Sequence, residues 1–398
     1  MARARGLVNP PLTRRDHLSF KGNLAGTRHG WLRLTPAYSV QLVSEILDGA
    51  TPGRVLDPFC GTGTTALACA ERGIACDTTD INPFLLWLTA AKARRYRARD
   101  LRDLRARGAE VAAAMARPGD HWTPPLHRIE RWWDAPALAA LAAGKAAIRG
   151  ASPTSDLLHV AFCRAAIECA HVSFGHQSMS FKQRAPRRAV EVWDAAVASI
   201  AGAAASPVAR EPRPILCDAR DLGTLDGGVY DLVITSPPYP NRMSYIRELR
   251  PYMYWLGYLA DGAAAGELDW QAIGGTWGRA TSNVARWTPE TPLAIRFDGF
   301  EALLDRIGRR SPLLSRYVHR YFHDMVRHTR ALHRVVAPGG RVVYVVGNSR
   351  FYDVLVPVEQ IFAALFESAG FHHPAVSVLR KRTSKAELFE FVVTATKK

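Results

Sequence analysis

A glycine-rich turn between a buried strand and a helix constrains the fold of this chain most. Residues 54–57 are expected to form a strand, and the segment Asp57-Pro58-Phe59-Cys60-Gly61-Thr62-Gly63-Thr64-Thr65 leads from it into a helix over about 64–72. The two glycines allow a sharp turn and a close approach of the backbone to a ligand, and the helix N-terminus offers free N–H groups. A GxG turn alone also fits an ordinary tight turn.

Strands and helices alternate on both sides of this turn. Helices are expected at 38–47, from Asn82-Pro83 onward, and near 313–335 and 357–369. Further strands are expected at 73–80, 214–218, 230–234, 341–346, 374–380 and 388–395. This alternation is the signature of a doubly wound parallel α/β sheet, here with seven strands and the last pair as a hairpin.

Changes of composition divide the chain. Residues 1–30 are polar and basic and are expected to form an arm, and residues 31–97 and 209–398 carry the alternating pattern of the α/β domain. Residues 98–208 are rich in Ala, Leu and Arg at helical spacing, which predicts a helical insertion. It could read bases, hold a nucleic-acid backbone or only pack. Residues 257–312 are expected to form a loop-rich insertion.

Acidic residues end the first three strands in the chain. Asp57 ends the first, Asp80 ends the second and Asp218 ends the third. At such positions a carboxylate can accept hydrogen bonds from ribose hydroxyls, as expected of Asp80, or from an adenine amino group, as expected of Asp218. The three acids together favour a nucleoside ligand. Because no P-loop lysine follows the glycine turn, nucleoside triphosphates are disfavoured.

The segment Thr235-Ser236-Pro237-Pro238-Tyr239 directly follows the fourth expected strand. Two prolines hold the backbone extended and leave carbonyls without local N–H partners, so a carbonyl beside Ser236 can accept a hydrogen bond from an amino group. Tyr239 can stack on a flat ring. A proline-rich turn with a packing tyrosine is the simpler interpretation of these letters alone.

At these residues the chain resembles the amino-group DNA methyltransferases, which make N4-methylcytosine or N6-methyladenine. DPFCGTGTT and TSPPY are similar to motifs I and IV of that family, and residues 28–37 resemble the segment that precedes motif I. The resemblance covers 28–92, 213–256 and about 313–396. It implies a seven-stranded Rossmann-like class I methyltransferase sheet, S-adenosyl-L-methionine as cofactor, and a DNA base flipped out of its stack as substrate.

The resemblance also implies roles for individual residues. Those implied to perform the chemistry are Ser236, Pro237, Pro238 and Tyr239. Those implied to bind the cofactor are Thr35, Pro36, Asp57, Phe59, Cys60, Gly61, Thr62, Gly63, Thr64, Asp80, Ile81, Asn82, Asp218 and Ala219.

The identity of the substrate base rests on one position. A serine before PPY is more typical of the cytosine-N4 members, whereas adenine-N6 members more often carry Asp or Asn there. Adenine-N6 methylation, guanine-N2 methylation of RNA and an inactive nucleic-acid-binding scaffold stay open. Cytosine-C5 chemistry is disfavoured because no Pro-Cys-Gln nucleophile motif occurs.

The charge balance favours a polyanionic partner. Lys and Arg outnumber Asp and Glu by 52 to 36, a formal net charge of +16. Double-stranded DNA is the expected partner, with cognate restriction or defence proteins as further candidates. Residues that could contact DNA, or that form only a solvated face or ordinary loop, are Arg94, Arg95, His176, Lys182, Arg242, Trp277 and Arg279.

The remaining features argue for a cytoplasmic protein without a metal. The six cysteines form no CxxC pair, as expected of reduced thiols, and no apolar run is long enough for a signal peptide or a membrane span. His319 and His323 lie four residues apart but lack the HExxH pattern, so packed or solvated helix residues are expected rather than metal ligands.

Overall fold

The computed structural model describes residues 18, 22–23, 26–32, 38–173, 180–183, 185–276, 278–382 and 387–398. Four residues named in the sequence analysis lie outside these ranges: Thr35, Pro36, His176 and Trp277. Most of the expected N-terminal arm also lies outside them.

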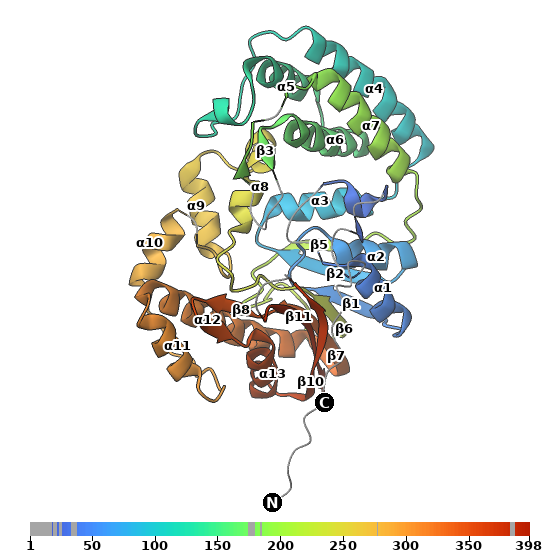
Figure 1. Cartoon of the computed structure of the whole chain (residues 1–398). Helices are drawn as coiled ribbons and strands as arrows, with labels where there is room; N and C mark the ends of the chain where they lie inside the picture. Colours follow the sequence, from blue (N-terminus) through green and yellow to red (C-terminus); the bar gives the residue numbers. More distant parts are fainter. Residues whose placement is uncertain are drawn as a thin grey trace, which may run out of the picture.

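A seven-stranded sheet forms the centre of the described chain (Figure 1). Its order is β10-β11-β7-β6-β1-β2-β5, in which β11 runs antiparallel to both of its neighbours and the other pairs from β7 to β5 are parallel. The strands are β1 (Arg54–Asp57), β2 (Ala75–Asp80), β5 (Arg213–Leu216), β6 (Tyr230–Thr235), β7 (Val336–Gly347), β10 (Phe371–Lys381) and β11 (Phe389–Lys397). The expected doubly wound sheet with a closing hairpin is therefore confirmed.

Successive residues of the central strands face opposite layers of helices. Val55 and Leu232 pack with buried residues of α1 (Val40–Asp48) and α2 (Thr64–Arg72). Their chain neighbours Leu56 and Val233 pack on the other face, which α12 (Pro312–Val335) and α13 (Val358–Ser368) cover. The buried central strands are apolar on both faces for this reason.

Strand β7 starts at Val336 rather than at the expected position 341. Its pairing with β6 jumps from Tyr230–Val336 to Leu232–Arg341, so extra residues bulge between these pairs. A Cβ at Gly340 would lie only 2.8 Å from the Tyr230 carbonyl oxygen, which explains the glycine at this bulge.

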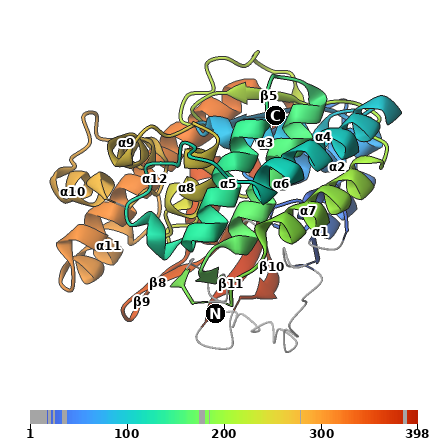
Figure 2. The ribbon, with the colours of Figure 1, turned by 90° about the horizontal axis from the view of Figure 1, so that it is seen from above.

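Four long helices occupy the chain between β2 and β5, after α3 (Pro83–Ala93). Figures 1 and 2 show them as one block beside α3, at one end of the sheet. They are α4 (Ala98–Ala116), α5 (Ala135–Ala147), α6 (Pro153–Cys169) and α7 (Ala189–Ala204). A one-turn helix η4 (Ile129–Arg131) and a short hairpin of β3 (Val172–Ser173) with β4 (Ser180–Phe181) join them.

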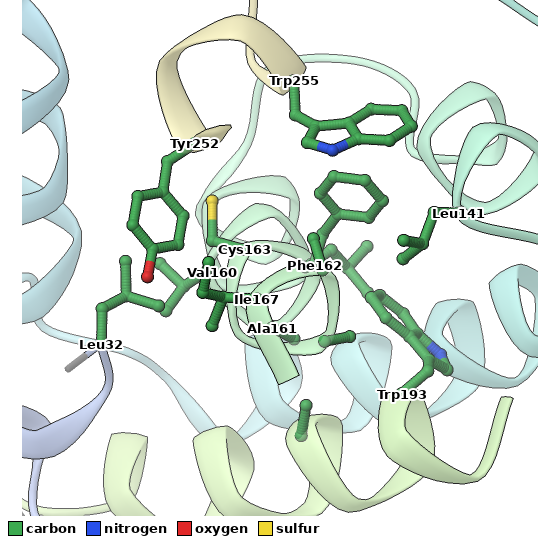
Figure 3. Packing of buried hydrophobic residues seen from close by; sticks show 14 of the residues in the cluster. Leu32, Leu141, Val160, Ala161, Phe162, Cys163, Ile167, Trp193, Tyr252 and Trp255 are labelled. Atoms are coloured by element: carbon green, nitrogen blue, oxygen red, sulfur yellow. The ribbon is translucent and has the colours of Figure 1, made fainter. Parts of the chain in front are cut away.

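The block shares one hydrophobic core with α8 (Tyr245–Trp255), which follows the SPPY segment (Figure 3). The ring of Trp255 lies 5.3 Å from that of Phe162 on α6 and 5.7 Å from that of Trp133. The Tyr252 ring stacks on Phe84 of α3, 5.7 Å away. Helices that precede and follow the SPPY segment in the chain therefore bury the same apolar surface.

Three short helices lie in the segment 257–312, so the expectation of a loop-rich insertion was wrong for much of it. They are α9 (Gly262–Gln271), α10 (Arg279–Arg286) and α11 (Phe300–Gly308). Helix α10 buries only Ala280 and Val284, one helical turn apart. Such a narrow apolar stripe between glycines and tryptophans gives little periodic signal in the sequence.

A single arginine holds the roots of the helical block. Arg28, in the one-turn helix η3 (Arg28–Gly30), is 2% exposed and uses all five of its N–H donors on backbone carbonyls. The acceptors are Lys92 and Arg94 where the chain leaves α3, and Ala203, Ala204 and Ser206 where it leaves α7. These are carbonyls at helix C-termini, which lack partners within their helices.

Two further observations complete the fold. All six cysteines are free and buried. Within the described ranges, no helix combines the length and the apolar character that a membrane span requires.

Candidate active site

The glycine turn after β1 is fixed by backbone hydrogen bonds and by close packing. The Cys60 N–H donates to the Thr79 carbonyl and the Gly63 N–H to the Cys60 carbonyl, both at 2.8 Å. Gly63 caps α2 with φ +76°, and a Cβ there would lie 2.5 Å from the Thr89 hydroxyl oxygen. Glycine is therefore required at this position for both its torsion angle and its lack of a side chain.

Asp57 lies beneath the turn and does not line the cavity described below. Its fully buried carboxyl accepts hydrogen bonds from the Thr235 hydroxyl at 2.5 Å and from the Phe59 N–H at 3.2 Å. Burial raises the pKa of Asp57 to about 7, against the opposing effect of these hydrogen bonds. The residue thus ties the turn to the strand that leads into SPPY.

Asp80 ends β2 directly beside the turn. Its carboxylate accepts the Gly61 N–H at 3.2 Å and the Asn82 N–H at 2.9 Å, while the Asn82 side chain caps α3. Desolvation raises the pKa of Asp80 to about 6, although backbone hydrogen bonds from Asn82 and Gly61 act in the opposite direction. A carboxylate at the wall of a cavity suits a ligand that carries hydroxyl donors.

Asp218 follows β5 and lines the cavity, but its carboxylate is already engaged. Arg220 binds it through Nε and Nη2, the latter at 2.6 Å from Oδ2. Burial favours a higher pKa for Asp218, but the hydrogen bonds and charge of Arg220 outweigh it and the pKa is lowered. An adenine amino group would therefore meet an ionised acceptor shared with a guanidinium.

The SPPY segment presents acceptors at the end of β6. The Ser236 hydroxyl donates to the Val345 carbonyl at 3.0 Å and lies 3.4 Å from the Tyr239 hydroxyl, which leaves at least one lone pair of its oxygen to an outside donor. The Pro238 carbonyl accepts the Tyr321 hydroxyl at 2.7 Å, whereas no described residue donates to the Pro237 carbonyl. Ser236 and Pro237 thus keep free acceptor capacity.

One cavity of about 310 Å³ brings these segments together. Sequence-predicted residues that line it are Phe59, Cys60, Gly61, Thr62, Thr64, Asp80, Ile81, Asn82, Asp218, Ala219, Ser236, Pro237, Pro238 and Tyr239. The cavity therefore joins the segments that resemble motifs I and IV. Asp57 and Gly63 support its wall from behind.

The closing hairpin adds charged residues that the sequence analysis missed. Arg380 on β10 and Glu390 on β11 line the cavity and form a two-pronged ion pair, with N–O distances of 2.7 and 2.9 Å. Arg382 lies 5.2 Å from the centre of the Tyr239 ring. Arg380 and Glu390 are direct cross-strand partners, so opposite charges on the two expected strands were the available signal.

Aromatic and apolar residues missed by the sequence analysis complete the wall. Tyr38, Met243 and Tyr245 line the cavity. The Tyr38 hydroxyl is hydrogen-bonded to Thr65, and the Tyr239 N–H donates to the Tyr245 hydroxyl at 3.4 Å. No short motif marks these positions, because they reach the cavity only through the packing of α1 and α8.

The residues proposed for DNA contact are dispersed. Arg94 forms a 2.8 Å ion pair with Asp156, and the Arg95 guanidinium donates to the Val208 carbonyl, so both have partners within the protein. Lys182 and Arg279 are exposed and do not line the cavity. Arg242 is exposed and follows Asn241 at the rim of the cavity.

His319 and His323 pack against the ring of Trp287, and His323 Nε2 lies 3.0 Å from the Thr291 carbonyl oxygen. No group of three or more metal-ligating side chains occurs within the described part of the chain.

The strand order gives a seven-stranded Rossmann-like α/β fold, with the cavity at the carboxyl edge of β1, β2, β5 and β6. No model of a known protein family matches the chain. A stretch of 72 residues is 33% identical to the type II methyltransferase M.AvaI of Nostoc sp., and equally to that of Anabaena variabilis. The match spans 17% of this chain and only 15% of those relatives.

Solved structures give distant matches. A SAM-dependent methyltransferase from Methanosarcina mazei is 10% identical over 88% of this chain and 96% of its own, with a TM-score of 0.32. The rRNA methyltransferase aviRa from Streptomyces viridochromogenes is 14% identical over 91% and 86%, with a TM-score of 0.28. A candidate DNA modification methylase from Thermus thermophilus is 17% identical over 46% and 52%, with a TM-score of 0.23.

Proposed function

We propose that this protein methylates an exocyclic amino group of a base in DNA, with cytosine N4 as the target and S-adenosyl-L-methionine as the methyl donor. The observation that carries the proposal is the hydrogen bonding of Ser236. Its hydroxyl donates to the Val345 carbonyl, so its oxygen can act as an acceptor in the cavity that Ser236 lines together with Pro237. The local similarity to a type II methyltransferase supports the same reaction class.

The cavity fits the proposed cofactor. Its volume of about 310 Å³ is within the range of small-molecule sites. Asp80 offers a desolvated carboxylate to ribose hydroxyls, the glycine turn allows close approach to the methionine part, and Phe59, Ile81 and Leu85 give apolar surface for a purine. When bound, S-adenosyl-L-methionine supplies an electrophilic methyl group on a sulfonium.

The chain's own residues prepare the base. An amino nitrogen of cytosine is a weak nucleophile because its lone pair is delocalised into the ring. Hydrogen bonds from that amino group to the Ser236 oxygen and the Pro237 carbonyl localise the lone pair on nitrogen, and Tyr239 holds the flipped ring by stacking. The surplus proton then leaves to water, since the two described hydrogen-bond partners of the Ser236 hydroxyl, the Tyr239 hydroxyl and the Val345 carbonyl, do not act as proton acceptors near neutral pH.

The test is direct product analysis. The purified protein is incubated with S-adenosyl-L-methionine and unmethylated genomic DNA, and the digested nucleosides are identified by mass spectrometry. N4-methylcytosine is expected for the wild type and should be absent for the Ser236→Ala/Tyr239→Ala double variant.

Other products would redirect the assignment. N6-methyladenine would keep the mechanism but change the base. N2-methylguanine in RNA, with unmodified DNA, would replace the substrate class. Cofactor binding without transfer to either nucleic acid would favour the inactive scaffold.

A further inference from the structure

A second cavity of about 310 Å³ adjoins the first one and has no role in the proposed reaction. Asn241 and Arg382 line both cavities, so the two are direct neighbours. The lining of the second includes the strand β8 (Ser349–Phe351) and Tyr352, which begins the turn to β9 (Val354–Val356) in the hairpin that follows β7. Asn348, which precedes this hairpin, fixes the chain around Glu387 and Phe389 through its side-chain amide.

Positive charge dominates this second cavity. Arg242, Arg350 and Arg382 line it, and none of the described residues in its lining is acidic. Arg350 reaches Glu387 at 3.1 Å, but the Glu387 side chain is 74% exposed, and such surface pairs are weak. The Arg242 guanidinium has no acidic partner among the described residues, although its backbone is held by Tyr317 and Thr276. Arg242 and Arg350 are therefore available to an anion.

A buried hydroxyl in the same wall lacks a partner. Ser349 is only 4% exposed, and its hydroxyl oxygen makes no hydrogen bond in the described structure. An unpartnered buried polar group costs free energy unless a ligand satisfies it. Because Ser349 lines the second cavity, a ligand oxygen placed there can accept its proton.

An exposed aromatic ring completes the cavity at the tip of the hairpin. Tyr352 is 54% exposed and adopts φ +56°, a left-handed conformation that is unfavourable for a bulky residue. The fold accepts this strain and presents a large ring to solvent beside arginines. Such rings are platforms on which nucleic-acid bases stack.

We propose that this second cavity binds the DNA strand next to the flipped nucleotide. Arg242, Arg350 and Ser349 hold the flanking phosphodiester, and Tyr352 stacks on the neighbouring base. Arg382 lies at the junction, where the Asn348 carbonyl holds it against Tyr239. This inference rests on the proposed function, because it assumes that a nucleic-acid base enters the first cavity.

The test measures DNA affinity by fluorescence anisotropy, using a labelled duplex of mixed sequence at several salt concentrations. Arg350→Ala and Tyr352→Ala are each expected to weaken binding about tenfold. The slope of log affinity against log salt should fall by about 0.9 for Arg350→Ala and stay unchanged for Tyr352→Ala, since only the arginine displaces a counterion.

Two further variants separate recognition from folding. Ser349→Ala should weaken DNA binding while leaving the melting temperature equal or higher, because it removes an unsatisfied buried hydroxyl. Arg341→Ala is the matched control, since Arg341 is exposed in the middle of β7 and does not line the second cavity. It should bind DNA as the wild type does.

The outcomes distinguish this inference from the proposed function. DNA methylation by the wild type, with Arg350→Ala and Tyr352→Ala binding like Arg341→Ala, would overturn the inference alone. Loss of DNA affinity in these two variants, in a protein that methylates no base, would leave the inference standing and overturn the proposed function. Tight binding of an RNA duplex of the same sequence, without binding of DNA, would overturn the choice of DNA.

Discussion

At the scale of single residues, two carboxyl groups of the site carry unusual proton affinities. Burial raises the pKa of Asp80 to about 6 and that of Asp57 to about 7. In the free protein both carboxyls therefore hold their protons at pH values where an exposed aspartate is ionised. Ligand binding at Asp80 and folding respond to pH in opposite ways.

Cofactor affinity should rise with pH through about 6. Ribose hydroxyls donate more strongly to an ionised carboxylate than to a neutral carboxyl, so binding favours the deprotonated form of Asp80. Calorimetric titration of S-adenosyl-L-methionine should give up to tenfold weaker binding per pH unit below 6 and a plateau above about 7. Asp80→Asn should bind weakly at every pH. Wild-type affinity that is flat from pH 5 to 8 would contradict this role.

The folding stability of the ligand-free protein should change in the other direction. Because the folded pKa of Asp80 lies above its unfolded value of 3.8, its contribution is complete below pH 3.8 and is lost as the pH rises through about 6. Asp57 acts in the same sense up to about pH 7. Melting temperatures from pH 5 to 8 should therefore fall less in the Asp57→Asn variant than in the wild type.

The glycine turn offers a matched pair of substitutions. Gly63→Ala combines φ +76° with a Cβ only 2.5 Å from the Thr89 hydroxyl, and should destabilise the protein by about 1–3 kcal/mol. Gly202 lies within α7, with no atom within 4 Å of an added Cβ, so Gly202→Ala should stabilise by about 0.5–1 kcal/mol. Urea denaturation measures both. Equal effects would show that the turn is not strained by a side chain.

At the scale of elements, the hydrogen bonds from Arg28 to the carbonyls after α3 and α7, which we call the Arg28 clasp, join segments that are far apart in the chain. Arg28→Lys removes donors that the carbonyls after α3 and α7 require, and should lower the free energy of unfolding by about 2–4 kcal/mol. Arg188→Lys, at the exposed start of α7, is the control and should change it by less than about 0.5 kcal/mol. Similar melting curves for the two variants would refute the clasp.

The elements were predictable where local sequence decides them. Strand β1 and helix α2 have the expected bounds, because a short apolar run, an αL glycine and a second glycine at the helix end mark them. The residues around Asp80 and SPPY that line the first cavity could be predicted because they lie at the ends of strands. The engagement of Asp218 by Arg220, the Arg380–Glu390 pair and the second cavity were not predictable, because they depend on register and side-chain packing.

At the scale of the whole molecule, the helical block and the sheet are not independent units. The core shared by Trp255, Phe162 and Tyr252 connects α6 to α8, which continues the SPPY segment (Figure 3). A block removed from this core would expose large aromatic rings on both sides. The insertion that the sequence delimits at residues 98–208 therefore shares its hydrophobic core with α3 and α8, and its described residues form no separate core.

Unfolding of the purified protein should accordingly be a single cooperative transition. Differential scanning calorimetry should give one peak, with a calorimetric enthalpy equal to the van't Hoff enthalpy. A chain in which a short linker replaces residues 98–208 should not fold, because α3 and α8 lose their apolar cover. Two resolved transitions would show that the helical block unfolds separately from the sheet. A stable shortened chain would show that the sheet folds without the block.

The Arg28 clasp has a mechanical consequence. A hinge needs a few residues whose torsion angles change freely, and the natural places for one are the two connections that enter and leave the helical block. One guanidinium grips the carbonyls of Arg94 on the way in and Ser206 on the way out, so neither connection is free to bend. We expect the block to travel with the sheet as one rigid body. A DNA duplex that contacts both the helical block and the sheet must then bend, because the protein does not. The ease with which a DNA sequence bends therefore becomes part of how that sequence is selected.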